Sequence, residues 1–185
     1  PVQNGFHLDK DIVGKNYANY DSVLVLSHFK GHAMAGLGGA LKNISIGIAS
    51  TQGKAYIHTA GVTTDAAELW SKLSPQDHFL ESMADACQAI IAYKGAENMV
   101  YINVANRLSV DCDCSANPAE PEMADLGIFA SLDPVAVDQA CYDAVLNSPD
   151  PGKKALIERM ESKHGIHTVE AAAQLGLGNR EYEIV

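Results

Sequence analysis

Hydrophobic and polar positions follow two patterns along this chain. Short apolar runs rich in β-branched residues predict strands, and longer stretches with apolar residues three or four positions apart predict helices. Strands are predicted at 21–27, 99–104 and 125–130, with weaker strand patterns at 44–49 and 181–185. Helices are predicted at 75–94, 134–146, 151–160 and 168–175. Because strands and helices alternate, we expect an α/β fold: one domain, 1–185, with a mostly parallel sheet and helices packed on it.

Several helix ends carry their own signals. Ser74 is the expected N-cap of the first long helix, with Pro75 in its first turn, and Gly95 is expected to end it. Asp133 is expected to cap the helix that follows it, because an aspartate at this position accepts hydrogen bonds from free amides. Gly176 is expected to end the last helix.

The stretch between the first strand and the first long helix has a weaker pattern. Residues 33–43 have a helical composition that is interrupted by glycines. Residues 51–76 are expected to be irregular, apart from a short helix at 65–72.

Composition and charge exclude some classes of partner. The chain has 185 residues, of which 47% are hydrophobic, a formal net charge of -10, and no basic cluster longer than Lys153–Lys154. Nucleic acids and acidic membranes bind positively charged surfaces, so we expect no nucleic-acid partner and no membrane partner. No apolar run approaches the roughly 20 residues that span a bilayer. We therefore expect a cytoplasmic protein.

Two further features bear on the size of the whole protein. Charged residues make up only 19% of the chain, which favours extensive buried surface and leaves a homo-oligomer open. The sequence begins at Pro1 rather than at Met, so we expect a processed domain or a fragment of a larger protein.

The run Asp111-Cys-Asp-Cys114 is a candidate metal site. In an extended segment, Cys112 and Cys114 place both sulfur atoms on the same side, and thiolates at this spacing suit a soft or borderline transition metal. Two thiolates are too few for a closed zinc site, so further ligands would come from His28, His32 or His58. An acidic loop with incidental cysteines, or a redox disulfide, remains an alternative. The other two cysteines, Cys87 and Cys141, lie in apolar helical patterns and are expected to be buried.

A second candidate group directly follows the first strand. His28 and His32 are four residues apart and could bind one metal ion, with Lys30 between them to hold an anion. Gly31 makes a loop as compatible as a helix, and two polar residues at a turn are the alternative. The glycine run that follows could let backbone amides receive a phosphate or a carboxylate, with Lys42 as a further contact. It matches neither the Walker A nor the dinucleotide fingerprint, and close packing of a helix against a sheet is its alternative.

The remaining polar residues give weaker signals. Asp133 and Asp138 could supply oxygen ligands, although capping explains Asp133 without further assumptions. Four histidines have no supporting neighbours in the sequence and are expected to be surface or structural residues. They are His7, His78, His164 and His167.

Five motifs in order resemble one family. They are residues 26–32, 36–43, 49–54, 111–114 and 128–138. Together they resemble the domain of unknown function 362 family, often labelled uncharacterised iron–sulfur centre proteins, from about residue 4 to residue 147. Many members carry an inserted ferredoxin-like module shortly after the segment matching 49–54, and a further region before the segment matching Pro1. Residues 51–76 contain no cysteine, so an in-chain ferredoxin-type iron–sulfur cluster is not expected here.

The motifs and the resemblance lead to three hypotheses, and they leave open whether the protein is an enzyme. The first is a metal-binding, redox-linked protein that binds or acts on a small anionic ligand, with electrons supplied by a separate carrier. Its metal ligands would be His28, His32, Cys112 and Cys114, and its acid–base residues Asp111 and Asp113. Its ligand-binding residues would be Lys30, Gly36, Gly38, Gly39, Lys42 and Asn43. The second is a non-catalytic module that binds a small anion or phosphate, and the third is a purely structural role for all these motifs.

Overall fold

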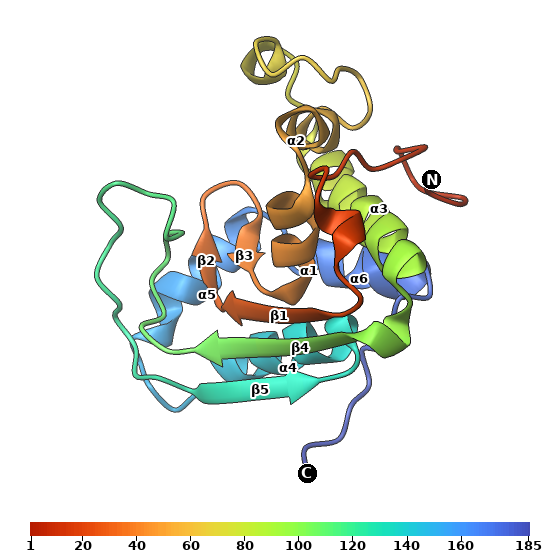
Figure 1. Cartoon of the computed structure of the whole chain (residues 1–185). Helices are drawn as coiled ribbons and strands as arrows, with labels where there is room; N and C mark the ends of the chain where they lie inside the picture. The colour runs from red at the N-terminus through yellow and green to blue at the C-terminus, as the bar shows by residue number, and fades with distance from the viewer.

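Three strands form the central sheet, in the order β1–β4–β5 (Figure 1). In this computed structural model, which describes residues 1–185, β1 (Val23–His28) pairs in parallel with β4 (Met99–Ala105). Strand β5 (Gly127–Ser131) pairs antiparallel with β4. The fold is mixed α/β, as predicted, but the expectation of a mostly parallel sheet is wrong. The reason is that a loop without a helix, 106–126, joins β4 to β5, so the chain turns back instead of crossing over.

The long helices lie where the hydrophobic pattern predicts them. They are α3 (Gln76–Lys94), α4 (Pro134–Asn147), α5 (Lys153–Ser162) and α6 (His167–Gln174). Asp133 caps α4 as predicted, because its carboxylate accepts from the backbone N–H groups of Val135 and Ala136. Gly95 ends α3 with a φ of 86°. Ser74 does not cap α3; Pro75 occupies that position, and the Ser74 hydroxyl donates to the carbonyl of His58.

The segment 30–58 differs most from its predicted structure. A short hairpin, β2 (Lys30–His32) and β3 (Gly36–Gly38), precedes α1 (Ala40–Lys42), a π-helical turn at Asn43–Gly47 and α2 (Thr51–His58). The predicted strand at 44–49 is therefore wrong, and so is the irregular structure predicted for 51–58. In the first part of this segment, the buried apolar residues Leu41 and Ile44 lie three positions apart, which is a helical spacing. Helix α2 begins at Thr51, where the Ser50 hydroxyl caps it by accepting from the amide of Gly53.

Two smaller predictions also fail. Of the short helix expected at 65–72, only a 3-10 turn at Leu69–Ser71 forms. Residues 181–185 form no strand and are exposed, because they do not pair with the free edge of β5.

The core lies on one face of the sheet. It packs between the inward side chains of β1 and β4, such as Val25 and Tyr101, and helices α3, α4 and α6. Figure 1 shows α4 behind the strands and no helix in front of them. On that uncovered face, Leu24 is 63% exposed and Ile128 is 71% exposed. No helix of the fold has the length and apolar character needed to cross a bilayer.

Candidate functional site

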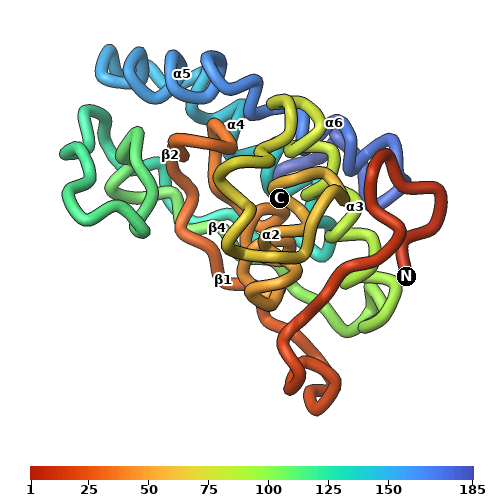
Figure 2. Tube along the Cα trace, turned by 90° about the horizontal axis from the view of Figure 1, so that it is seen from above, coloured from red at the N-terminus to blue at the C-terminus, as the bar shows by residue number.

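A polar cavity of about 330 Å³ lies at the carboxyl end of β1. Figures 1 and 2 show that the β2–β3 hairpin and the loop 106–126 lie side by side at this end of the strand. The cavity is lined by residues from β1, the hairpin, α1 and the loop. They are Leu26, Ser27, His28, Lys30, Gly38, Gly39, Lys42, Asn43 and Asp113. The structure thus brings together residues from two motifs that are about 70 positions apart in the sequence, at a strand end where α/β folds commonly bind ligands.

Glycines shape this region by allowing close packing. A Cβ atom on Gly31 would lie 2.3 Å from the carbonyl oxygen of Val110, and the Gly31 amide donates to the carbonyl of Ser109 at 2.9 Å. A Cβ atom on Gly39 would lie 2.3 Å from a carboxylate oxygen of Asp138. Only glycine permits both approaches, so the packing interpretation explains these two residues.

Asp138 has a structural role that the sequence did not indicate. Its carboxylate is fully buried and accepts from the backbone amides of Ala40 and Leu41, at 2.7 and 3.0 Å, and from the side chain of Asn103 at 2.7 Å. Burial raises the pKa of Asp138 to about 6, against the effect of these hydrogen bonds. The first amides of α1 are therefore occupied, and the expectation that they receive a phosphate does not hold. Asp138 is likewise committed to capping rather than to a metal.

Asp113 carries the negative charge of the cavity. Its carboxylate accepts from the Lys30 ammonium and lies 3.0 Å from Nδ1 of His28. Burial raises the pKa of Asp113, but these two hydrogen bonds outweigh it and hold the pKa below its usual value. His28 also has Nε2 at 2.7 Å from the carbonyl oxygen of Asn106. Both nitrogens of His28 thus face oxygen acceptors, which leaves neither of them free for a metal ion.

Lys42 is the charged residue of the cavity that has no partner in the chain. Its ammonium makes no hydrogen bond and no ion pair within the chain, although the side chain is half-buried. Burial lowers the pKa of Lys42, and the thiols of Cys112 and Cys114 act in the opposite direction. The side-chain amide of the nearby Asn43 is occupied by β1, because it donates to the backbone carbonyl of Leu26 and to the Ser27 hydroxyl.

The two cysteines of the loop lie close to His32. The ligand atoms of Cys112, Cys114 and His32 all lie within 4.8 Å of one another. Cys112 is buried, Cys114 is exposed, and both are free thiols. A hydrogen bond with Cys112, followed by burial, raises the pKa of the Cys114 thiol. Of the four predicted metal ligands, the structure groups three and places His28 with Asp113 instead.

His32 is a poor metal ligand in this arrangement. Its Nδ1 accepts from the backbone amides of Met34 and Ala35, at 3.1 and 3.0 Å. Burial, followed by the charge of Lys42, lowers the pKa of His32 to about 3, so the ring is neutral near neutral pH. Since a neutral imidazole carries one proton and Nδ1 is an acceptor, the proton belongs on Nε2. A metal ion would have to displace it.

The other predicted site residues lie outside the cavity. Asp111 accepts from Arg159 of α5 at 3.0 Å and from the Ala119 amide at 3.1 Å, and so ties the loop to α5. Gly36 has a φ of 77° and a Cβ atom there would lie 2.8 Å from the Cα atom of Gly165. Cys87 and Cys141 are buried in the core, as predicted.

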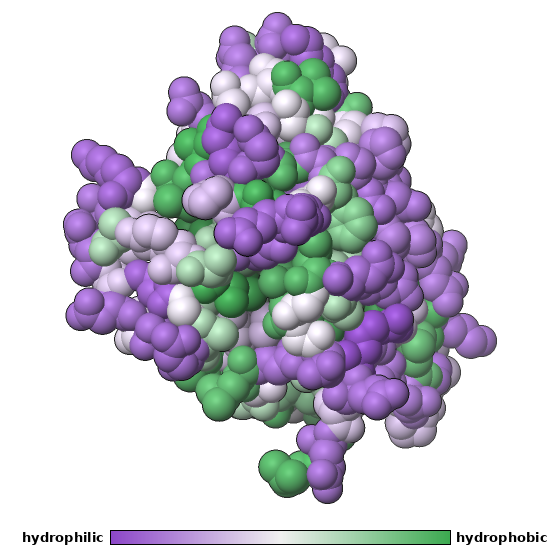
Figure 3. All heavy atoms as spheres, turned by 90° about the vertical axis from the view of Figure 1, so that its right-hand side faces the viewer, coloured by the Kyte–Doolittle hydropathy of each residue, from purple (hydrophilic) through white to green (hydrophobic).

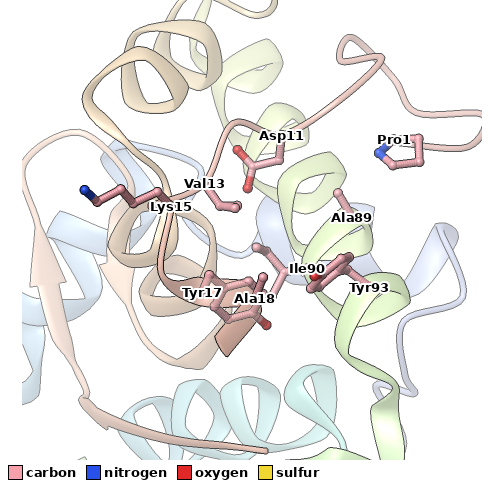
Figure 4. Close-up of a pocket in the computed structure, with 10 residues that line it drawn as sticks. Pro1, Asp11, Val13, Lys15, Tyr17, Ala18, Ala89, Ile90 and Tyr93 are labelled. Atoms are coloured by element: carbon pink, nitrogen blue, oxygen red, sulfur yellow. The ribbon is translucent and has the colours of Figure 1, made fainter. Parts of the chain in front are cut away.

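A second, mainly apolar pocket of about 270 Å³ lies between the N-terminal segment and α3 (Figure 4). The rings of Tyr17 and Tyr93 form part of its wall, and Asp11 has a buried carboxylate oxygen without a hydrogen-bond partner. Burial raises the pKa of Asp11 to about 6. Figure 3 shows this side of the molecule, on which apolar patches lie between hydrophilic side chains. None of the predicted site residues lines this pocket.

Comparison with known proteins identifies a family. The model of a family described as "Domain of unknown function (DUF362)" matches residues 1–143, which include the cavity and every residue that lines it. No curated protein and no solved structure matches the chain.

Proposed function

The chain belongs to the DUF362 family, whose description assigns no activity, and we propose from the site itself that the protein binds a small anion in the cavity beside Lys42. The observation that carries this proposal is that Lys42 is half-buried while its ammonium has no hydrogen-bond or ion-pair partner in the chain. A partly desolvated charge without a counter-ion is unfavourable. The electrostatic attraction between Lys42 and an anion in the cavity is therefore stronger than that between an anion and an ammonium in water.

The other charges of the cavity support the same ligand class. Lys30 is almost fully buried and its only acidic partner, Asp113, sits on an exposed loop. The Asp113 carboxylate occupies the place between Lys30 and His28 that an anionic ligand could share or take over. Phosphate and carboxylate both fit, because each offers several acceptor oxygens to ammonium groups. A cavity of about 330 Å³ is large enough for a small metabolite that carries one such group.

An equilibrium titration with inorganic phosphate, and separately with a dicarboxylate such as succinate, tests this proposal. Replacing Lys42 by Met keeps most of the length of the side chain and removes its charge, so we expect binding to weaken at least about tenfold, or about 1.4 kcal/mol. Lys54→Met is the matched control, because Lys54 is exposed on α2 and lies outside the cavity. Absence of binding to the unmodified protein, or equal binding by the Lys42→Met variant, would contradict the proposal.

A second candidate function rests on the two thiols. Cys112 and Cys114 suit a soft or borderline ion such as Zn²⁺, which would keep open positions because the protein supplies few ligands. The ion would have to displace the thiol protons and, if His32 joins, the Nε2 proton. The set does not fit a four-thiolate iron–sulfur cluster, because the other two cysteines are buried in the core. If a redox-active ion binds here, a separate electron carrier would serve it.

Elemental analysis of protein purified without a histidine tag separates the two functions. Metal binding at the thiols predicts that Cys112→Ser lowers the metal content by close to one equivalent, whereas Lys42→Met leaves it unchanged. If metal content is unchanged in the Cys112→Ser variant, the thiols are not the site. Anion binding that persists after chelation supports the primary proposal and is independent of this second one.

A further inference from the structure

Four of the seven histidines gather in one place far from the predicted motifs. They come from the N-terminal segment, the first turns of α3, the turn after α5, and α6. The cluster consists of His7, His78, His164 and His167 together with the acidic residues Asp77, Glu81 and Glu170. Their ligand atoms fall into two groups in which all atoms lie within 4.8 Å: His7–His78–Glu81 and His164–His167–Glu170.

Asp85 fixes the position of His7. Its carboxylate is fully buried and accepts from three consecutive backbone amides, those of Phe6, His7 and Leu8, at 2.8 to 2.9 Å. Figures 1 and 2 both place this N-terminal segment beside α3. Since Glu81 lies one helical turn before Asp85, the docked segment holds the His7 ring directly against Glu81.

Glu81 is the centre of the cluster. One of its oxygens lies 2.5 Å from Nε2 of His7, and the other lies 3.1 Å from Nε2 of His167. The rings of His7 and His78 lie 4.3 Å apart and are tilted by 31°. His78 is exposed and its ring makes no hydrogen bond, so it can turn without breaking other contacts.

We propose that His7, His78 and Glu81 bind a divalent transition-metal ion of the zinc class. Imidazole and carboxylate ligands suit this class, and a ligand set from one helix plus a docked segment gives it two imidazole nitrogens and one oxygen. The ion replaces the proton shared by His7 and Glu81, and that proton is released to solvent. His167 holds the second oxygen of Glu81 and so orients the carboxylate towards the ion.

The geometry needs only a small adjustment. Ligands bonded at about 2.0–2.1 Å around a tetrahedral ion lie about 3.3 Å apart, so the present spacing of up to 4.8 Å has to contract slightly. Rotation of the exposed His78 ring provides that movement. The second group is less suited, because His167 is already bonded to Glu81 and His164 to Asp77 at 2.9 Å.

Titration of Zn²⁺ into a tag-free Cys114→Ser variant tests the proposal. Cys114 is exposed, and its replacement removes the paired thiols as a competing site, so failure here is distinct from failure of the functions proposed above. We expect one equivalent of Zn²⁺ to bind in this background. Adding His78→Ala should weaken binding more than about a hundredfold. Loss of a residue that only hydrogen-bonds to a metal ligand lowers metal affinity about 10- to 100-fold, and loss of a ligand should lower it further. Glu81→Gln should weaken it as well.

His164→Ala is the matched control. It removes another exposed histidine of the same cluster, and the proposal predicts a change of less than about threefold. Hydrogen exchange gives an independent readout, because Zn²⁺ should protect the amides of residues 6–8 by holding His7 against α3. The proposal is overturned if His78→Ala binds Zn²⁺ as well as its parent, or if His164→Ala loses binding to the same extent.

Discussion

The cavity at the end of β1 and the histidine cluster on α3 differ in how their charges are paired. In the cavity, Lys42 has no partner, and Lys30 depends on an aspartate from an exposed loop. In the cluster, Glu81 already has an imidazole at each of its oxygens. An anion can therefore bind Lys42 without breaking an existing ion pair, whereas a metal ion that binds the cluster must compete with a proton.

The two regions also differ in how they are built. The cavity residues stand on a hairpin and a loop whose glycines allow close backbone packing, as at Gly31 and Gly39. Most of the cluster residues stand on helices. His164 belongs to the turn after α5, and His7 belongs to an irregular segment, which Asp85 holds in place. We expect substitutions in the cavity to alter ligand affinity, and substitution of Asp85, which anchors the cluster, to alter the free energy of unfolding.

The largest expected effect comes from Asp85→Ala. This change leaves three backbone amides without their acceptor, and each unsatisfied buried group costs about 1–3 kcal/mol, so we expect a loss of about 3–5 kcal/mol in the free energy of unfolding. Urea denaturation measures it. Gln88→Ala, one turn further along α3, removes two exposed hydrogen bonds to Gln3 and should cost about 1 kcal/mol or less. Equal losses in the two variants would show that Asp85 does not anchor the segment.

A smaller effect, of opposite sign, is expected from Asp113→Asn. Removing this charge leaves Lys30 without its carboxylate and makes the cavity more positive, so phosphate should bind about tenfold more tightly at low ionic strength. Calorimetric titration measures the change. Glu120→Gln alters the same charge on the same loop, but Glu120 pairs with Arg107 outside the cavity and should leave affinity unchanged. Weaker binding by Asp113→Asn would mean that Asp113 contacts the ligand favourably.

The smallest expected effect is a local response of the loop 106–126 to acid. The amide of Ala119, and then Arg159, hold the pKa of Asp111 below its usual value of 3.8, and the pKa of Asp113 is also lowered. A carboxyl group with a lowered folded-state pKa stabilises the fold above the unfolded pKa and loses that contribution as pH falls through the folded value. Hydrogen exchange corrected for pH should therefore show this loop opening below about pH 4 while α4 stays protected. Simultaneous opening of both would indicate global unfolding instead.

Local patterns were sufficient to predict the long elements. Helices α3 and α4 and strands β1 and β4 follow from apolar spacing, and Asp133 caps α4 because Pro134 and free amides follow it. The failures have physical causes. Residues 44–49 alternate in polarity, yet packing of Leu41 and Ile44 into the core selects a helix over a strand. The direction of β5 depends on the path of a long loop, which no local pattern records.

The two sites also differ in how far the sequence could predict them. Each motif of the cavity is a short continuous stretch of sequence, so the sequence could point to Lys30, Lys42 and Asp113. It could not tell that His28 would face Asp113 rather than the thiols. The sequence did not predict the histidine cluster, because its members lie in separate segments that only the fold brings together. The spacing of His78 and Glu81, and of His167 and Glu170, by three residues was the one available signal, since such pairs share a helix face.

Crystals soaked in selenate would test the central proposal most directly, because selenate resembles phosphate in shape and charge and its selenium scatters anomalously. We predict an anomalous peak inside the cavity within hydrogen-bonding reach of the Lys42 Nζ atom, and no peak there in crystals of the Lys42→Met variant. A cavity that stays empty while selenate binds elsewhere, or a cavity peak that persists without the Lys42 charge, would contradict the account.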